Sequence, residues 1–223
     1  MQTMPHGYTN RTTGDGRVVT KSYLGPGAAL RCAREADVLT GLAGRLPVPR
    51  VLGRRDGRLE LEFIPGVPGQ QLVDDGRAEE VLGACGLMLR RIHAVSPATA
   101  GITGHRDGAA VLVHGDYGPN NTLLDPAGRE VTGVVDWEWA HAGDPVEDLA
   151  WCEWIIRMHH PGHVGSLNAL FEAYGWRPPW AARHEVMIGR CQALLAMCER
   201  WHPAGDAVRL WQRRIQVTES WPA

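Results

Sequence analysis

The sequence reads HGDYGPNN at residues 114–121 and VVDW at residues 134–137, and these two stretches decide the fold. The first follows the short apolar run VLV, which predicts a strand. Between the two stretches, apolar runs flank the turn residues DPAG, a pattern that predicts a β-hairpin. Asp116, Asn121 and Asp136 therefore stand at strand ends, where side chains can be held rigidly. Each of them alone is equally typical of a turn, so only their combination in this order indicates chemistry.

Oxygen-bearing side chains at strand ends suit the transfer of a phosphoryl group. This reaction needs a carboxylate close to an acceptor hydroxyl and hard oxygen ligands for magnesium. The order His114-Gly115-Asp116, then Asn121, a hairpin and Asp136 resembles the aminoglycoside phosphotransferase and choline kinase superfamily, whose members are similar to protein kinases. The resemblance implies an α+β fold with two lobes, a small β-rich N-terminal lobe and a mainly helical C-terminal lobe.

Roles for the residues of the two stretches follow from this resemblance. It implies that Asp116 is the catalytic aspartate and faces the acceptor hydroxyl. It implies that Asn121 and Asp136 bind the magnesium ions that bridge the ATP phosphates, and that His114 supports the loop without taking part in the chemistry. A general base contributes roughly 10²- to 10⁴-fold to a rate, so positioning and electrostatics must supply much of the rest.

Lys21 is the only lysine among the 23 lysine and arginine residues of the chain. In such a chain a retained lysine favours a site that needs a compact ammonium, although chance is the alternative. Lys21 lies in RVVTKSY, which predicts a strand, and a helix is expected from about 28 to 44. The resemblance implies that Lys21 binds the ATP phosphates and that Glu35 on this helix pairs with it. Asp37 competes with Glu35 for that role, and a solvated helix face is the other explanation.

Residues 58–64 alternate between polar and apolar side chains, which predicts a half-buried strand. The linker PGVPG follows, and we place the lobe boundary there, with an N-terminal lobe at 1–65 and a C-terminal lobe at 66–223. The resemblance makes EFIPG the hinge, where the backbone of Phe63 and Ile64 would bind adenine. It also makes GYTNR at 7–11 the nucleotide-covering loop, although this stretch is not rich in glycine.

The C-terminal lobe is predicted to be mainly helical. A helix capped by Asp74 or Asp75 should end near Ala94. Val81, Leu82, Leu89 and Ile92 are its expected core face.

From Asp144 onward the chain should be helical again, with breaks near PG at 161–162 and PP at 178–179. The string DPVE at 144–147 has the pattern of a helix start, with an N-cap aspartate, proline at the first position and glutamate at the third. The resemblance implies that Asp148, just inside this helix, supports the catalytic loop.

Acceptor specificity should lie in the C-terminal part of the chain, which is rich in tryptophan. The residues concerned are Trp137, Trp139, Trp151, Trp154, Trp176, Trp180, Trp201 and Trp211. One explanation is an aromatic pocket that binds a cationic amine, and the other is core packing and helix docking. Glu138, Glu153 and Glu172 could pair with ammonium groups of an aminoglycoside-like acceptor, or could simply be solvated at the surface.

Composition excludes several other classes of protein. A formal net charge of -2 provides no basic surface for nucleic acid. The sequence shows neither a signal-peptide pattern nor an apolar run of the roughly 18 to 20 residues that a membrane span needs. The five cysteines are odd in number and include no Cys-x-x-Cys, so neither a disulfide framework nor a zinc site is indicated. We expect a cytoplasmic protein without nucleic-acid or membrane partners, whose oligomeric state the sequence leaves open.

The resemblance implies an ATP- and Mg²⁺-dependent O-phosphotransferase. Its acceptor would be a hydroxyl of a small molecule, such as an aminoglycoside or another antibiotic. One alternative is a metabolic kinase for choline, a sugar or a similar compound. A second alternative is a catalytically silent kinase-like binding protein, which the short nucleotide loop and the short chain leave open.

Overall fold

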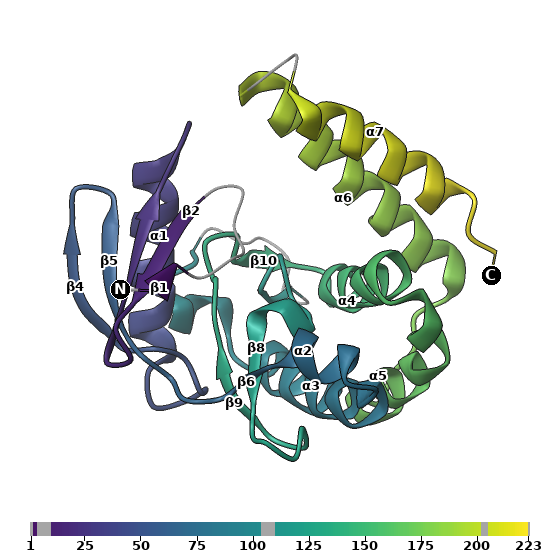
Figure 1. Ribbon diagram of the computed structural model, residues 1–223, viewed down its shortest axis with the longest axis horizontal. Helices are drawn as coiled ribbons and strands as arrows, with labels where there is room; N and C mark the ends of the chain where they lie inside the picture. Colours follow the sequence, from purple (N-terminus) through teal and green to yellow (C-terminus); the bar gives the residue numbers. More distant parts are fainter. Residues whose placement is uncertain (1, 4–9, 104–109, 202–204, 223) are drawn as a thin grey trace.

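The computed structural model describes residues 2–3, 10–103, 110–201 and 205–222. Within them the chain forms the expected α+β fold: a β-rich lobe with one long helix, and a larger lobe made mainly of helices (Figure 1). The boundary that we expect after residue 65 falls between the strands β5 (Arg58–Glu62) and β6 (Val67–Pro68).

The N-terminal lobe is built on one antiparallel sheet with the strand order β1-β2-β3-β5-β4. Its remaining strands are β1 (Gln2–Thr3), β2 (Asn10–Gly14), β3 (Val18–Tyr23) and β4 (Val51–Arg55). Helix α1 (Ala28–Leu42) packs against this sheet through its buried side, which includes Val38, Leu39 and Leu42. Strand β4 has no counterpart in the prediction, yet Asp56 and Gly57, with φ of 42° and 74°, form the Asp-Gly turn that typically joins two hairpin strands.

The C-terminal lobe combines two small sheets with a set of helices. Strand β7 (Val111–Val113) pairs with β10 (His141–Gly143), and β8 (Thr122–Leu124) pairs with β6 and with β9 (Val131–Val134). The helices are α2 (Gly69–Asp74), α3 (Ala78–His93), α4 (Val146–His159), α5 (Leu167–Tyr174), α6 (Trp180–Trp201) and α7 (Asp206–Glu219). Short 3-10 helices lie at Pro97–Ala100, Pro119–Asn121 and Pro161–Ser166. The predicted hairpin at 122–135 is therefore confirmed.

Two hydrophobic cores hold the molecule together. The larger one is continuous across both lobes and includes the predicted face of α3, formed by Val81, Leu82, Leu89 and Ile92. The smaller one joins α4, α6 and α7, where the rings of Trp151, Trp154 and Trp211 stack on one another. Figure 1 shows α6 and α7 side by side as a hairpin of helices at the edge of the larger lobe.

Of the two predicted helix starts, one is wrong and one is confirmed. The expectation that one helix is capped by Asp74 or Asp75 is wrong, because Asp74 ends α2, and the left-handed Gly76 (φ 84°) separates α2 from α3. The expected start at Asp144 is confirmed. The carboxylate of Asp144 accepts the Val146 amide at 2.8 Å, and Glu147 accepts the Asp144 amide at 2.9 Å, which is the reciprocal geometry of a capping box.

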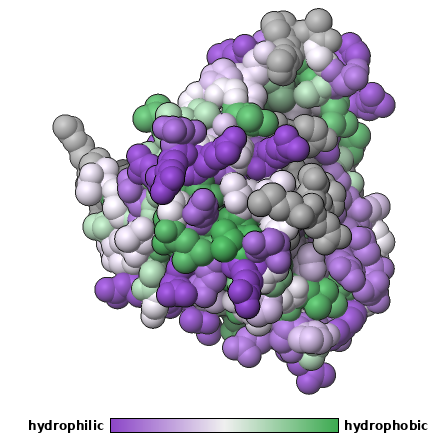
Figure 2. Space-filling model, turned by 60° about the vertical axis from the view of Figure 1, so that its left-hand side comes forward, coloured by the Kyte–Doolittle hydropathy of each residue, from purple (hydrophilic) through white to green (hydrophobic). Residues whose placement is uncertain are grey.

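The surface has mixed polarity. Figure 2 shows an apolar area near the middle of one face, bordered by hydrophilic side chains. The large apolar side chains exposed in the described part of the chain are Leu24, Leu30, Leu52, Leu87, Trp176 and Val217. Among the described helices, none combines the length and the hydrophobicity that a membrane crossing requires.

Candidate active site

The predicted catalytic loop joins β7 to β8, and His114 lies at its start. The imidazole Nδ1 accepts the Asp116 amide at 3.2 Å, and Nε2 donates to the Val135 carbonyl at 3.0 Å. This pattern requires the neutral tautomer with its proton on Nε2. Complete burial lowers the pKa of His114, which keeps the ring neutral. His114 therefore ties the loop to the segment that carries Asp136.

Asp148 on α4 supports the same loop through hydrogen bonds to its backbone. Its carboxylate accepts the backbone amides of His114 at 2.8 Å and Gly115 at 2.9 Å, and it contacts His93 of α3 at 3.2 Å. Burial alone would raise the pKa of Asp148, but these hydrogen bonds and the neighbouring imidazole hold it below its usual value. A charged carboxylate thus fixes the backbone on the N-terminal side of Asp116.

The carboxylate of Asp116 is held by two side chains. The Asn121 amide donates to Asp116 Oδ2 at 2.8 Å and to its carbonyl at 2.7 Å, while Trp151 Nε1 donates to Oδ1 at 2.7 Å. Burial, together with repulsion from Asp136, raises the pKa of Asp116 to about 6. A carboxylate in this environment accepts a proton more readily than one in water.

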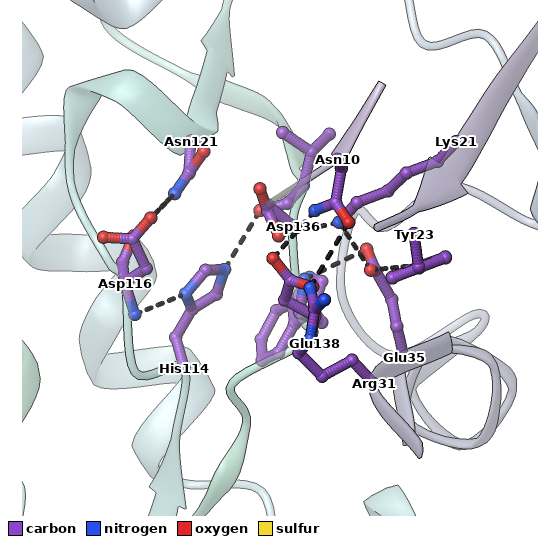
Figure 3. Close-up of polar contacts among 12 residues, drawn as sticks. Asn10, Lys21, Tyr23, Arg31, Glu35, His114, Asp116, Asn121, Asp136 and Glu138 are labelled. Atoms are coloured by element: carbon purple, nitrogen blue, oxygen red, sulfur yellow. Dashed lines mark hydrogen bonds and ion pairs between the residues drawn. The ribbon is translucent and has the colours of Figure 1, made fainter. Parts of the chain in front are cut away.

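Lys21 lies on the opposite side of Asp136, in the N-terminal lobe. Its ammonium contacts Glu35 at 2.6 Å and Asp136 at 2.7 Å, as Figure 3 shows. Burial alone would lower the pKa of Lys21, but the carboxylates of Asp136 and Glu35 reverse this and raise it, so the side chain stays charged. Asp37 is exposed on the same helix, so the structure brings Glu35 and not Asp37 to the lysine.

Asp136 stands between the two groups of side chains (Figure 3). Its φ of 68° lies in the left-handed region, which is uncommon for a residue other than glycine and is often found where surrounding contacts determine the backbone. Its side chain is 30% exposed, so a cation can reach it from solvent. Asp136 and the amide oxygen of Asn121 are the hard oxygen donors that Mg²⁺ prefers, and the donor set therefore fits this ion.

The predicted adenine-binding backbone lies just after β5. The Phe63 amide donates to the Arg17 carbonyl at 3.0 Å, so adenine cannot use this donor while that bond stands. Ile64 lies against Gly133 of β9, where a Cβ would come within 3.0 Å of its side chain. Of the predicted nucleotide-covering loop, residues 7–9 lie outside the described residues, whereas Asn10 begins β2 and donates to Glu138 at 2.8 Å.

A pocket of about 370 Å³ lies beside Asp116. It is lined by Gly115, His141, Asp144, Glu147, Trp151, Val186 and Arg190. Trp151 both lines this pocket and donates to the Asp116 carboxylate, so the pocket lies next to that carboxylate. Arg190 of α6 donates to the Gly115 carbonyl at 2.5 Å and lies over the rings of Trp139 and Trp151 at 5.9 and 5.7 Å.

The two explanations offered for the C-terminal glutamates both fail for Glu138 and Glu153. These carboxylates are buried and paired, Glu138 with Arg31 and Glu153 with Arg157 and Arg183, so they are neither solvated nor directed at an acceptor. Glu172 is exposed and lines a separate pocket of about 450 Å³ beside α5. Trp137, Trp154 and Trp211 are core residues, whereas Trp151 combines packing with a contact to Asp116.

Sequence reasoning missed several residues of the site. Tyr23 donates its hydroxyl to Glu35, and Arg31 and Arg190 reach the site from α1 and α6. Trp151 was named only as a possible residue of an aromatic pocket, and its contact with Asp116 was not foreseen. A local signal existed for it: Trp151 lies three residues after Asp148, so both side chains share one face of α4. For Arg190 we find no such local signal.

The fold and this arrangement of Lys21, Glu35, Asp116, Asn121 and Asp136 define a protein of the kinase-like class. Comparison of the sequence with family models agrees, since the model described as "Phosphotransferase enzyme family" matches residues 2–109 and 102–186. The chain belongs to this family.

Solved structures support the same fold. The GDP and kanamycin complex of APH(2")-IIia has a TM-score of 0.76 at 14% identity, covering 98% of this chain and 92% of that one. The macrolide 2'-phosphotransferase MphH from Brachybacterium faecium has a TM-score of 0.66 at 20% identity, covering 100% and 93%. A choline/ethanolamine kinase family protein from Mesorhizobium loti has a TM-score of 0.69 at 16% identity, covering 96% and 85%. At such low identities these likenesses show the fold alone.

A curated mouse protein also matches part of the sequence. This is acyl-CoA dehydrogenase family member 10 of Mus musculus, which is 41% identical over 46 residues, or 21% of this chain. The chain spans only 4% of that protein's length.

Proposed function

We propose that the protein transfers the γ-phosphoryl group of Mg²⁺-ATP to a hydroxyl of a small molecule, such as an aminoglycoside or a related antibiotic. The observation that carries this proposal is the convergence of Lys21, Asp116, Asn121 and Asp136 on one site from both lobes. In this proposal residues 1–65 bind the nucleotide, and residues 66–223 supply the catalytic loop and the acceptor site.

Asp116 would act on the acceptor hydroxyl. Its carboxylate accepts hydrogen bonds from Asn121 and Trp151, which fix its orientation. Its pKa of about 6 allows it to take the hydroxyl proton as the acceptor oxygen bonds to phosphorus and ADP leaves. Most of the rate enhancement would come from this positioning.

Charges for the triphosphate would come from both lobes. Lys21 holds an ammonium in place between two carboxylates, so it can donate to phosphate oxygens without large reorganisation. Asn121 and Asp136 would hold the magnesium ion, which neutralises charge on the phosphates when bound. The backbone at Phe63 and Ile64 would contact adenine through groups other than the Phe63 amide.

The pocket beside Asp116 is the proposed acceptor site. It has the aromatic ring of Trp151, the carboxylates of Asp144 and Glu147, and the guanidinium of Arg190. The structural neighbours named above include complexes or enzymes of aminoglycosides and macrolides, which favours an antibiotic as acceptor. The choline/ethanolamine kinase neighbour supports the second candidate, a metabolic small-molecule kinase.

Magnesium-dependent ADP release tests the proposal. Purified protein is assayed with a panel of aminoglycosides, macrolides, peptide antibiotics, choline, sugars and nucleosides. Asp116→Asn is the inactive control, and we expect it to lower acceptor-stimulated release by roughly 10²- to 10⁴-fold. The exposed Asp37→Asn on α1 is the matched control and should leave release unchanged.

Each result separates the candidates. Release stimulated by an antibiotic and lost in Asp116→Asn supports the leading proposal, and stimulation by choline or a sugar supports the metabolic alternative. Failure to bind Mg²⁺-ATP in a direct titration would exclude both and leave a silent kinase-like protein.

A further inference from the structure

The segment Asp136–Trp139 is fixed to the N-terminal lobe along its whole length. Asp136 contacts Lys21, and the Trp137 amide donates to Glu35 Oε1 at 3.1 Å. Glu138 and Trp139 also have partners in that lobe, and both contact the same residue, Arg31. Figure 3 shows Glu138 and Arg31 close to the Lys21–Glu35 pair.

Glu138 is fully engaged by this lobe. Its Oε2 accepts Arg31 Nη1 at 2.5 Å, and its Oε1 accepts the Asn10 amide at 2.8 Å. The carboxylate is 1% exposed and the Arg31 side chain 7% exposed, so the ion pair is buried. Such a pair gains little stability over an apolar pair, but breaking it on one side leaves an uncompensated buried charge. The presence of the Arg31–Glu138 pair is therefore better explained by the geometry that it imposes than by a gain in stability.

Arg31 is itself held from several sides. It donates to the Leu24 carbonyl at 2.5 Å, and its guanidinium lies over the rings of Trp139 at 5.6 Å and Trp201 at 5.4 Å. A guanidinium with this many directional contacts has little freedom to move, and lysine could not reproduce them.

Helix α1 thereby contacts the segment twice. Arg31 and Glu35 are four residues apart, so they lie on one face of the helix and reach adjacent residues, Glu138 and Trp137. Two contacts one turn apart fix both the distance and the orientation of the helix relative to the segment. Asp136, whose backbone is in the uncommon left-handed region, directly precedes the fixed residues.

We propose that Arg31 and Glu138 are positioning residues, which hold the segment Asp136–Trp139 on α1 and thereby place Asp136 for magnesium and nucleotide. Glu138, although it is an acidic residue two positions after the candidate metal ligand, does not bind the metal. The inference rests on the proposed function for the purpose of the positioning, but not for the existence of the contact.

The first test needs no nucleotide. Backbone hydrogen–deuterium exchange of the peptide covering residues 136–139 is compared in wild type, Arg31→Met, Glu138→Gln and the double variant. Each single variant should accelerate exchange on the order of 10-fold, because the segment opens more easily. The double variant should exchange no faster than Arg31→Met, because that change already removes the ion pair with Glu138. Arg34→Met, an exposed arginine on the same helix, is the matched control and should exchange like wild type.

The double variant also guards against misfolding of the single variants, since it leaves no unpaired buried charge. If the double variant exchanges as slowly as wild type, the pair has no positioning role and the inference fails.

The second test separates positioning from metal binding. The affinity for a non-hydrolysable ATP analogue is measured over a magnesium titration. Positioning predicts that Arg31→Met and Glu138→Gln both weaken binding, on the order of 10-fold, and that the two variants have the same magnesium half-saturation as each other. A shift of the magnesium half-saturation in Glu138→Gln alone would make Glu138 a metal ligand and overturn the inference. If wild type binds no nucleotide, the proposed function fails, whereas the exchange experiment still decides the positioning contact.

Discussion

The two halves of the candidate active site are held together over very different distances along the chain. On the catalytic-loop side, Asp116 contacts Asn121 five residues away, and His114 reaches Val135 over 21 residues. On the nucleotide side, Lys21 contacts Asp136 over 115 residues, and Arg31 contacts Glu138 over 107. The first half therefore depends on a loop and a hairpin, and the second half on the packing of the two lobes. Mutations in the two halves should therefore differ in their effects on stability and activity.

The largest effect is expected at Asp148, which supports the local half. Asp148→Ala removes the acceptor of two backbone amides at 2.8 and 2.9 Å in the buried start of the loop. Each unsatisfied donor costs about 1–3 kcal/mol, so the loss of the two bonds should lower the free energy of unfolding by about 2–6 kcal/mol. In a chain of this size that lowers Tm by roughly 4–24 °C, measured by calorimetry.

A matched control distinguishes this effect from the loss of any aspartate. Asp206 forms an exposed ion pair with Arg209 at the start of α7. Asp206→Ala should change the free energy of unfolding by less than about 1 kcal/mol. Equal losses in the two variants would show that the loop does not depend on Asp148.

The next effect is expected at Lys21, in the half that depends on lobe packing. Lys21→Arg keeps the charge but requires a planar fork where Glu35 and Asp136 enclose a compact ammonium at 2.6 and 2.7 Å. We expect kcat/KM for ATP to fall by about 10²-fold while Tm changes little, because the arginine can still neutralise Glu35. Arg58→Lys, an exposed change in the adjacent strand β5, is the control. Activity within about threefold of wild type would mean that the site requires a positive charge at position 21 but not the compact shape of an ammonium.

The sequence predicted the local half well for a physical reason. The spacing of Asp116, Asn121 and Asp136 reports a loop and a hairpin, and both form through contacts between near neighbours. The capping pattern at Asp144 is equally local, and it is confirmed. Where local patterns compete, prediction failed: both Asp74 and Asp75 could cap a helix, but Gly76 divides the segment into two helices.

The remaining part of the site could not be derived from spacing alone. Lys21 and Glu35 were found because the family resemblance placed them, while Arg31, Glu138 and Arg190 were not assigned their contacts. These depend on buried ion pairs and aromatic stacking between elements about 75 to 107 residues apart. No period of 2 or 3.6 residues reports such contacts, so only the packed structure shows them.

Arg190 allows a smaller test of the acceptor side, which resembles the nucleotide side in its long-range contacts. Arg190→Lys should lose the hydrogen bond to the Gly115 carbonyl and the stacking on Trp139 and Trp151. We expect kcat/KM for the acceptor to fall by about 10-fold, on the order of one charged hydrogen bond. The assay uses whichever acceptor stimulates ADP release.

Arg214→Lys is the matched control for this change. Arg214 lies over Trp154 and Trp211 at 5.6 and 4.5 Å, and it lies on α7, outside the residues that line the pocket. If both variants lose activity equally, aromatic packing of the helix hairpin and not the contact with the catalytic loop explains the effect.

The smallest effect is a pH dependence at His141 and Glu147, which face each other at 2.9 Å in the pocket beside Asp116. The hydrogen bond with Glu147 raises the pKa of His141; burial of Glu147 alone would raise its pKa, but the imidazole lowers it. A raised histidine pKa stabilises the fold below the unfolded value of about 6.5, and this contribution is lost as pH rises through the folded pKa. The lowered pKa of Glu147 acts in the opposite sense, since its contribution is lost as pH falls through the folded value.

Both groups are therefore charged, and the pair is most stabilising, between about pH 4.5 and 6.5. Because both side chains are 37% exposed, solvent screening limits the effect to about 0.5–1 kcal/mol. We expect the difference in unfolding free energy between wild type and His141→Gln, measured by urea titration, to be largest near pH 6 and to decrease toward pH 8. A difference that stays constant over this range would mean that His141 contributes through its neutral hydrogen bond, and that no charge changes near neutral pH in the pocket beside Asp116.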